Sequence, residues 1–82
     1  MLTPSKSDCI TVLSAASHIA NPAEVVSLDP AALGLTMNQM TTTASFLGER
    51  ACFLTYRRGV DQCAVGALSL QGRLRLDQLV SD

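Results

Sequence analysis

The sequence predicts one small α+β domain over residues 1–82, built from helices and a β-hairpin. The chain length of 82 residues suffices for a single modest core but not for two. Hydrophobic residues make up 48% of the chain, yet aromatic residues make up only 4% and there is no tryptophan. The core must therefore come from aliphatic side chains, which favours helix packing over an aromatic-rich sandwich. Stretches with helical spacing of apolar residues are separated by shorter stretches of strand-like composition.

The first predicted element is an amphipathic helix over about residues 4–20. Thr3 and Pro4 form a typical start, an N-cap followed by proline at the first helical position. His18 falls near the end of this helix, where a lone histidine usually interacts with the helix dipole or with solvent. The apolar residues recur at three- and four-residue spacing: Cys9, Val12, Leu13, Ala16, Ile19 and Ala20.

Two prolines divide the next stretch. Asn21-Pro22 ends the first helix, because proline cannot continue the hydrogen-bond ladder and restricts the residue before it. Residues 24–28 favour a brief strand, with a helical turn as the alternative. Asp29-Pro30 then starts a short helix that runs through Leu33.

A tight turn separates this short helix from the central helix, predicted over residues 37–47. Gly34 suits the positive φ that ends a helix, and Thr36 with Gln39 forms a capping box that begins the next one. One face of the central helix is apolar, with Met40, Ala44 and Leu47. The opposite face carries short, uncharged hydrogen-bonding side chains: Asn38, Gln39, Thr41, Thr42 and Ser45. A helix–turn–helix with such a face is compatible with a DNA recognition element, which is our leading interpretation.

The remaining sequence predicts a hairpin and then an ambiguous segment. Residues 51–56 alternate like a strand, residues 57–62 have the polar, glycine-containing composition of a loop, and residues 63–70 supply the returning strand. Residues 70–76 alternate like a third strand. The helix propensity of the last segment nevertheless favours a helix over about residues 72–80.

Composition narrows the possible classes of function. No apolar run approaches the roughly 20 residues of a bilayer span, and the N-terminus lacks the regions of a signal peptide, so we expect a cytoplasmic protein with no membrane contact. Three cysteines without Cys-x-x-Cys spacing predict buried reduced thiols, although a hairpin would allow Cys52 and Cys63 to face each other. We expect no metal, no cofactor and no enzymatic activity, because the sequence offers no ligand set, phosphate loop or nucleophile–base pair.

The formal net charge of −1 counts against a protein held to DNA mainly through phosphates. The distribution of charge along the chain favours DNA binding more than the net charge does. Five of the six basic residues lie in the C-terminal half of the chain: Arg50, Arg57, Arg58, Arg73 and Arg75.

The predicted order of elements resembles the winged helix-turn-helix family of bacterial and phage regulators. Residues 27–36, Ser-Leu-Asp-Pro-Ala-Ala-Leu-Gly-Leu-Thr, look like the second helix and turn of that family, and residues 37–47 look like its recognition helix. Arg57-Arg58-Gly59 resembles the tip of the wing, and residues 68–73 are similar to the step into the last helix. The resemblance implies three helices, a two-strand β-hairpin wing, and a C-terminal helix or third strand.

The resemblance also implies which residues contact DNA. Asn38, Gln39, Thr41, Thr42 and Ser45 would face the major groove, where Asn and Gln pair with adenine and Thr contacts an acceptor or a thymine methyl. Arg57 and Arg58 would touch phosphates or the minor groove, and Arg50 would contact the DNA backbone.

Two functions follow from this interpretation. The first is a sequence-specific transcriptional regulator that binds double-stranded DNA as a homodimer, because a single module buries too little surface to be selective. The alternative is a winged-helix protein–protein interaction module, an adaptor or inhibitor that does not bind DNA, which the sequence pI of about 5.6 suits. Its apolar contacts would include Met37, Phe46 and Phe53, together with the leucines of the last segment.

Overall fold

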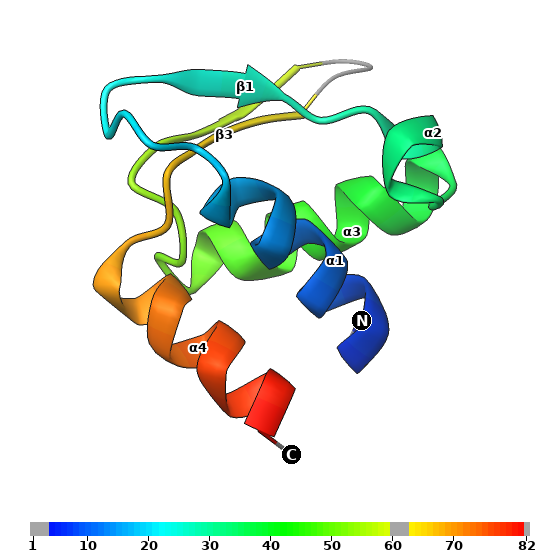
Figure 1. The fold of residues 1–82 in the computed structure, drawn as a ribbon. Coiled ribbons are helices and arrows are strands. Elements are labelled where there is room, and N and C mark those ends of the chain that lie inside the picture. Colours follow the sequence, from blue (N-terminus) through cyan, green and yellow to red (C-terminus); the bar gives the residue numbers. More distant parts are fainter. Residues whose placement is uncertain (1–3, 60–62, 82) are drawn as a thin grey trace.

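The structure is a computed structural model that describes residues 4–59 and 63–81. Within them the chain forms four helices and a three-stranded antiparallel sheet, which confirms the predicted α+β class (Figure 1). The elements, in chain order, are α1 (Lys6–Ser17), β1 (Val25–Ser27), α2 (Pro30–Leu33), α3 (Met37–Glu49), β2 (Tyr56–Arg58), β3 (Cys63–Gly66) and α4 (Leu70–Ser81).

The predicted N-terminal helix is confirmed as α1, but α1 begins and ends at other residues than predicted. Its N-cap is Ser5, whose side chain accepts a hydrogen bond of 3.1 Å from the backbone N–H of Asp8. The predicted cap, Thr3, lies outside the described residues, and Pro4 precedes the helix. The helix ends at Ser17 with His18 as C-cap, three residues before the predicted end. The buried side of α1 is formed by Cys9, Val12, Leu13 and Ala16.

The turn between α2 and α3 forms as the sequence predicts. Asp29 caps α2 by accepting from the N–H of Ala31, and Gly34 ends it with φ of 72°. Thr36 and Gln39 form the full capping box at the start of α3. These local hydrogen bonds fix where α3 begins, and the helix then extends two residues beyond its predicted end.

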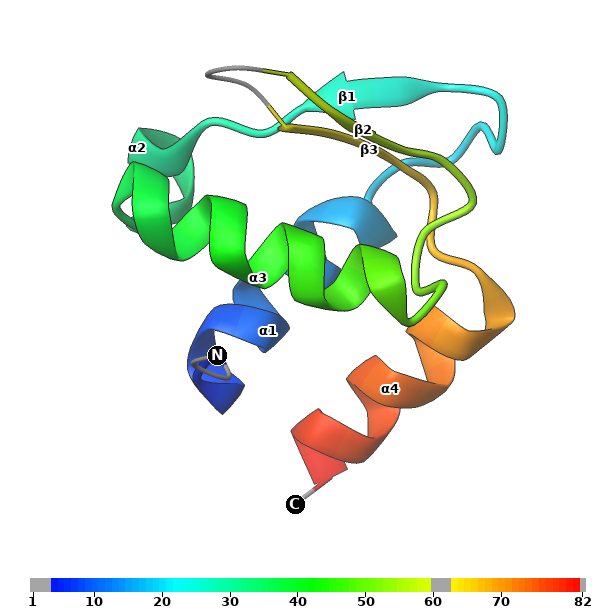
Figure 2. The ribbon, with the colours of Figure 1, turned by 180° about the vertical axis from the view of Figure 1, so that it is seen from behind.

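The sheet has the strand order β1-β3-β2, so β1 joins the hairpin as a third strand (Figure 2). The predicted first hairpin strand, residues 51–56, is wrong for most of its length. Ala51 has a φ of 56° and ends α3, and Phe53 makes only an isolated bridge to Leu68, so this segment is used to turn the chain back toward the sheet. The strand begins at Tyr56 and includes Arg57 and Arg58, which were expected in the loop.

The three cysteines are free and buried, as predicted. The alternative in which Cys52 and Cys63 face each other across the hairpin is wrong. Cys63 pairs with Arg58 at one end of the hairpin, whereas Phe53, next to Cys52, pairs with Leu68 at the other end.

The C-terminal segment forms helix α4, which confirms the favoured prediction and makes the third-strand alternative wrong. Strand β3 accordingly ends at Gly66 rather than at residue 70. The Ser69 hydroxyl accepts from the N–H of Gly72 and donates to the carbonyl of Ala51, which ties the start of α4 to the end of α3. Gly72 is buried, because α4 packs directly on the carbonyl of Cys52.

Helices α1 and α3 cover one face of the sheet, and α4 packs on α1 (Figures 1 and 2). The predicted inner face of α3 is confirmed, since Met40, Ala44 and Leu47 are fully buried. Phe53 is only 7% exposed, so its expected role as an exposed contact is wrong. In the part of the chain that the structure describes, no helix has the length and apolar character needed to cross a bilayer.

Candidate functional site

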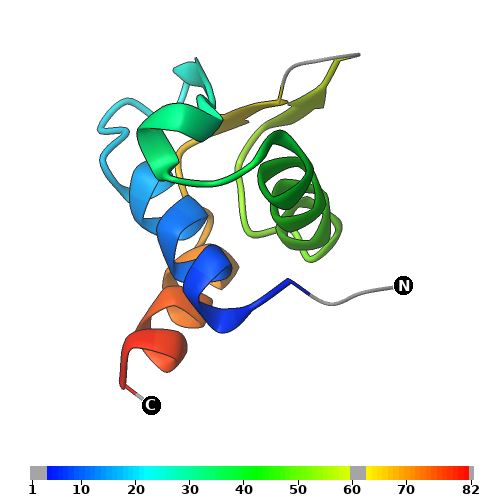
Figure 3. The ribbon, with the colours of Figure 1, turned by 90° about the vertical axis from the view of Figure 1, so that its right-hand side faces the viewer.

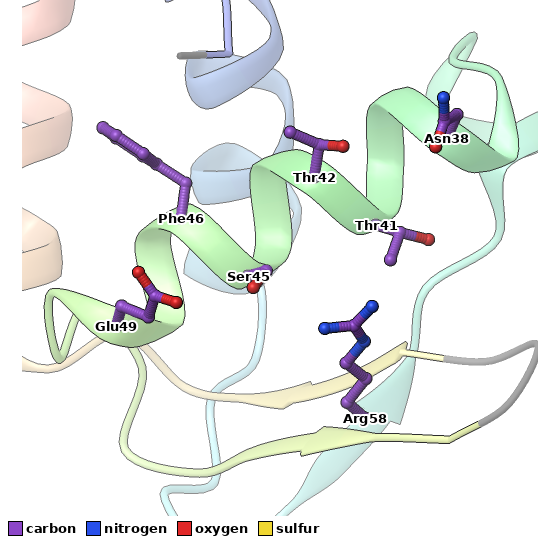
Figure 4. Close-up of a pocket in the computed structure, with 7 residues that line it drawn as sticks. All are labelled: Asn38, Thr41, Thr42, Ser45, Phe46, Glu49 and Arg58. Carbon is purple, nitrogen blue, oxygen red and sulfur yellow. The ribbon is translucent and has the colours of Figure 1, made fainter. Parts of the chain in front are cut away.

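A groove of about 210 Å³ runs between the outer side of α3 and strand β2 (Figure 4). It brings together five of the eight predicted DNA contacts and two residues that were not among them. The lining residues are Asn38, Thr41, Thr42, Ser45, Phe46, Glu49 and Arg58.

The position of the buried residues determines which side chains α3 presents to this groove. Met40, Thr43, Ala44 and Leu47 are fully buried and fix the rotation of the helix about its axis. Residues three or four positions apart share a face of a helix, so positions 38, 41, 42, 45, 46 and 49 come to lie on the opposite side. Figure 4 shows Asn38, Thr42 and Phe46 on the side of α3 away from β2, whereas Thr41 is nearer to the strand.

The two arginines of β2, Arg57 and Arg58, lie on opposite faces of the sheet. Successive side chains of a strand alternate between its faces, and Arg58 pairs with the buried Cys63, whereas Arg57 pairs with Ala64. Arg58 therefore shares the face that α3 covers, and its guanidinium extends toward Thr41 (Figure 4). Arg57 does not line the groove.

Tyr56 sets the spacing between the two walls of the groove. A Cβ added at Gly48 would lie 2.9 Å from the Tyr56 ring, so the ring packs directly on the backbone of α3. The Tyr56 phenol oxygen is buried beside Ser45 and makes no hydrogen bond that meets normal geometry with a described residue. Burial, with a smaller contribution from the Cys63 thiol, raises the pKa of Tyr56 above its ordinary value of 10.0.

The polar side chains on α3 differ in how free they are to bind a ligand. Asn38 and Thr42 are exposed and make no side-chain hydrogen bond to the described residues. Thr41 donates its hydroxyl to the carbonyl of Met37 at 2.8 Å, which leaves its oxygen able to accept. The Gln39 side-chain oxygen accepts from the Thr36 N–H at 2.9 Å, so Gln39 serves the helix cap and does not line the groove.

Arg50 is held against the C-terminal end of α3. Its guanidinium carbon lies 3.5 Å from the centroid of the Phe46 ring, and its Nη1 donates to the Phe46 carbonyl at 3.1 Å. This arrangement combines a cation–π contact with a favourable position for a positive charge near a helix C-terminus. Arg50 therefore flanks the groove beside Phe46 without lining it.

Two groove residues were not among the predicted DNA contacts: Phe46, which was expected only as an apolar contact of the alternative function, and Glu49, which was not predicted at all. The helical spacing that selects Asn38, Thr42 and Ser45 also selects position 46, and it extends to position 49 because α3 continues two residues beyond its predicted end. Residue type explains why neither was assigned to DNA: Phe46 is apolar and was expected to contact a protein partner, and Glu49 was interpreted as a surface charge. In the groove, Glu49 supplies a negative charge and Arg58 a positive one.

The described residues contain no group of three or more His, Cys, Asp or Glu side chains that could hold a metal ion. The chemistry of the groove is thus that of hydroxyl, amide, carboxylate and guanidinium groups around one half-buried aromatic ring. No family model, curated protein or solved structure matches the chain.

Proposed function

We propose that the chain is a sequence-specific transcriptional regulator of the winged-helix type, which binds double-stranded DNA as a homodimer and catalyses no reaction. The observation that carries this proposal is the groove, where the hydrogen-bonding side of α3 lies beside the guanidinium of Arg58. A helix supplies base contacts and an adjacent arginine supplies a phosphate contact, which are the two components that DNA recognition requires.

The arrangement of the elements supports the winged-helix assignment. Helices α2 and α3 are joined by a tight turn, and the hairpin of β2 and β3 follows α3 directly, with β1 added to the hairpin as a third strand. Helix α3 has 13 residues, about 20 Å at ~1.5 Å per residue, and the major groove is about 12 Å wide. Such a helix is long enough to place several side chains on base edges.

The side chains on α3 are suited to reading bases. Asn38 can form two hydrogen bonds with adenine, and Thr42 can contact either an acceptor or a thymine methyl. Phe46 offers a second apolar contact for a thymine methyl, and the Glu49 carboxylate can accept from the amino group of cytosine. In this proposal Gln39 acts through the helix cap, and Thr41 and Ser45 contribute from the side nearer β2.

The arginines hold the DNA backbone in three separate places. Arg58 contacts a phosphate beside α3, and Arg57 reaches the backbone from the other face of the hairpin. Arg50, fixed on Phe46, adds a contact at the C-terminal end of α3. Few phosphate contacts give a modest dependence of affinity on salt, which suits the net charge of −1.

A second copy supplies the selectivity that one module lacks. A single small DNA-binding module buries roughly 600–1,000 Å², and two such modules related by a two-fold axis read a palindromic site. We therefore expect the preferred DNA to be an inverted repeat.

The test is selection from a random duplex pool, read by sequencing the retained DNA at a low and a higher salt concentration. We expect the wild-type protein to retain DNA that shares an inverted repeat, and R58A not to bind that DNA. R58K should bind it weakly, because lysine keeps the positive charge but lacks the planar guanidinium of arginine. K6A serves as the charge-matched control, since Lys6 is on α1 and does not line the groove. A pool that is not retained even at low salt would overturn the proposal.

The absence of Lys and Arg from α3 favours a second candidate function, a protein–protein interaction module. Met37 is 45% exposed at the start of α3 and Phe46 is half-buried in the groove, so both are available to an apolar partner surface. The double variant R57A/R58A separates the two functions, because it abolishes DNA binding under the first and leaves partner binding intact under the second.

A further inference from the structure

Helix α4 carries an apolar side that no part of the described chain covers. Leu70, Leu74 and Val80 are 74%, 55% and 64% exposed, respectively. The opposite side of α4 is anchored on the core through buried Gly72 and through Leu76 and Leu79, which pack against the core cluster. Three large exposed hydrophobic side chains on one 12-residue helix indicate a surface that meets another molecule.

Two opposite charges complete this surface. Positions 70, 73, 74, 77 and 80 fall within about 120° of the helix circumference, at ~100° per residue. They place Arg73 and Asp77 on the same side as the three apolar residues. Both charged side chains are exposed, and neither forms an ion pair with another described residue.

The order of residues on this surface is self-complementary. If the order of residues along α4 is reversed about position 75, Leu70 takes the place of Val80 and Arg73 takes the place of Asp77. Leu74 lies next to the centre of this reversal. In an antiparallel pair of helices with a two-fold axis at that level, each Arg73 meets an Asp77 of the other copy. Each Leu70 then meets Val80 of the other copy, and the two Leu74 side chains meet near the axis.

We propose that α4 pairs with α4 of a second copy of this chain, antiparallel, about a two-fold axis near residue 75. This inference rests on the homodimer of the proposed function and names its surface. The position of α4 suits the role, because it lies on the far side of α1 and α3 from the sheet (Figures 1 and 3). Pairing through α4 leaves the groove beside β2 open.

The size of the surface predicts a weak dimer. Helix α4 is about 18 Å long at ~1.5 Å per residue. One such helix pair buries less than the roughly 800 Å² per partner of a standard stable interface. Association is therefore concentration-dependent, and two DNA half-sites bound together strengthen it.

The first experiment compares two aspartate substitutions at apolar residues of equal exposure. The mass of the full chain is measured by sedimentation equilibrium across a range of concentrations, without DNA. The wild-type mass rises from 8.7 kDa toward twice that value. L74D stays at the mass of one chain, whereas L54D, at a residue 54% exposed but outside α4, associates like the wild type.

A charge exchange tests the antiparallel register. R73D and D77R each place like charges across the axis in two pairs. We expect each variant to weaken association and so to raise the dissociation constant of the dimer about tenfold. The double variant R73D/D77R restores both pairs, and an equal mixture of the two single variants associates better than either alone. The loss in the single variants and its recovery in the double variant identify the antiparallel pair. In a parallel pair residue 73 would face residue 73, so like charges would face each other in the wild type, in both single variants and in the double variant alike.

Two results would overturn the inference: a wild-type chain that stays at the mass of one chain at its highest soluble concentration, or a dimer that L74D and the charge variants leave unchanged. Circular dichroism confirms that each variant is folded. A chain that selects DNA yet remains monomeric overturns the α4 interface alone. A dimer that L74D disrupts but that binds no DNA supports the interface and overturns the proposed function.

Discussion

Gly72 is the point of closest approach between α4 and the segment that follows α3, and replacing it with alanine tests how these elements pack. A Cβ at this position would lie 2.1 Å from the carbonyl oxygen of Cys52, 3.0 Å from its carbonyl carbon and 3.0 Å from a methyl carbon of Leu68. Real Cβ atoms essentially never approach another atom more closely than 3.0 Å. Helix α4 or the backbone of Cys52 must therefore move by about 1 Å, and neither is a flexible side chain.

The magnitude follows from two opposing effects. Alanine favours a helix over glycine by about 1 kcal/mol. Overpacking against a rigid neighbour costs typically about 1–3 kcal/mol and occasionally more, and the approach to a backbone carbonyl places this site at the upper end. We expect G72A to lower the free energy of unfolding by about 2 kcal/mol, which corresponds to a decrease in Tm of about 10 °C for a domain of this size.

The assay is urea unfolding followed by circular dichroism, with two control variants. Q71A, at the exposed neighbouring residue, should stay within about 0.5 kcal/mol of the wild type. G34A has open space for the methyl but a φ of 72°, so it should cost roughly 1–2 kcal/mol through backbone strain alone. A G72A protein as stable as the wild type, or more stable, would refute the close packing of α4 on Cys52.

Three further predictions concern the helix cap, the buried phenol and alkaline pH. T36A removes one half of the capping box at α3 and should cost about 1 kcal/mol in the free energy of unfolding, and an unchanged urea midpoint would contradict the cap. Y56F removes a buried hydroxyl that has no hydrogen bond of normal geometry among the described residues, so stability should change by less than about 1 kcal/mol, whereas a loss above about 2 kcal/mol would reveal a bond. Burial raises the pKa values of Cys9 and Cys52 above 9.0 and that of Tyr56 above 10.0. The folded state thus holds these protons more tightly than the unfolded chain, and its stability should be constant below about pH 8 and fall above pH 9 in urea titrations, where a rise would be the contrary result.

The sequence predicted the elements whose signals are local. Asp29-Pro30, Gly34 and the pair Thr36 and Gln39 act through hydrogen bonds and backbone angles within a few residues, and the structure places α2, the turn and α3 as expected. The inner face of α3 was also predictable, because the spacing of Met40, Ala44 and Leu47 needs no knowledge of the partner that buries it.

The errors arise where distant parts of the chain decide the outcome. Residues 51–55 have strand-like composition. However, α4 packs against Ala51 and Cys52 through Ser69 and Gly72, so this segment forms a turn instead of pairing with a neighbouring strand. Alternation along β2 separates Arg57 from Arg58, but which of the two lies on the face that α3 covers depends on the register with β3.

Four of the polar residues that α3 presents to the groove lie at positions that the helical spacing predicted: Asn38, Thr41, Thr42 and Ser45. The sequence could not show that Gln39 is used by the cap or that Arg50 stacks on Phe46, because both are matters of side-chain conformation. The inclusion of Glu49 depends on where α3 ends, two residues beyond the predicted boundary.

The packing of Tyr56 on Gly48 sets the spacing between the walls of the groove through residues that do not line it. The Tyr56 ring and the buried residues of α3 keep the two walls apart. The side chains of Asn38 and Thr42 are exposed and make no hydrogen bond to the described residues, so they do not support the fold. Positions 38 and 42 can therefore change without loss of the scaffold, and under the proposed function such changes alter which DNA is preferred. A library randomised at these two positions would be expected to yield folded proteins.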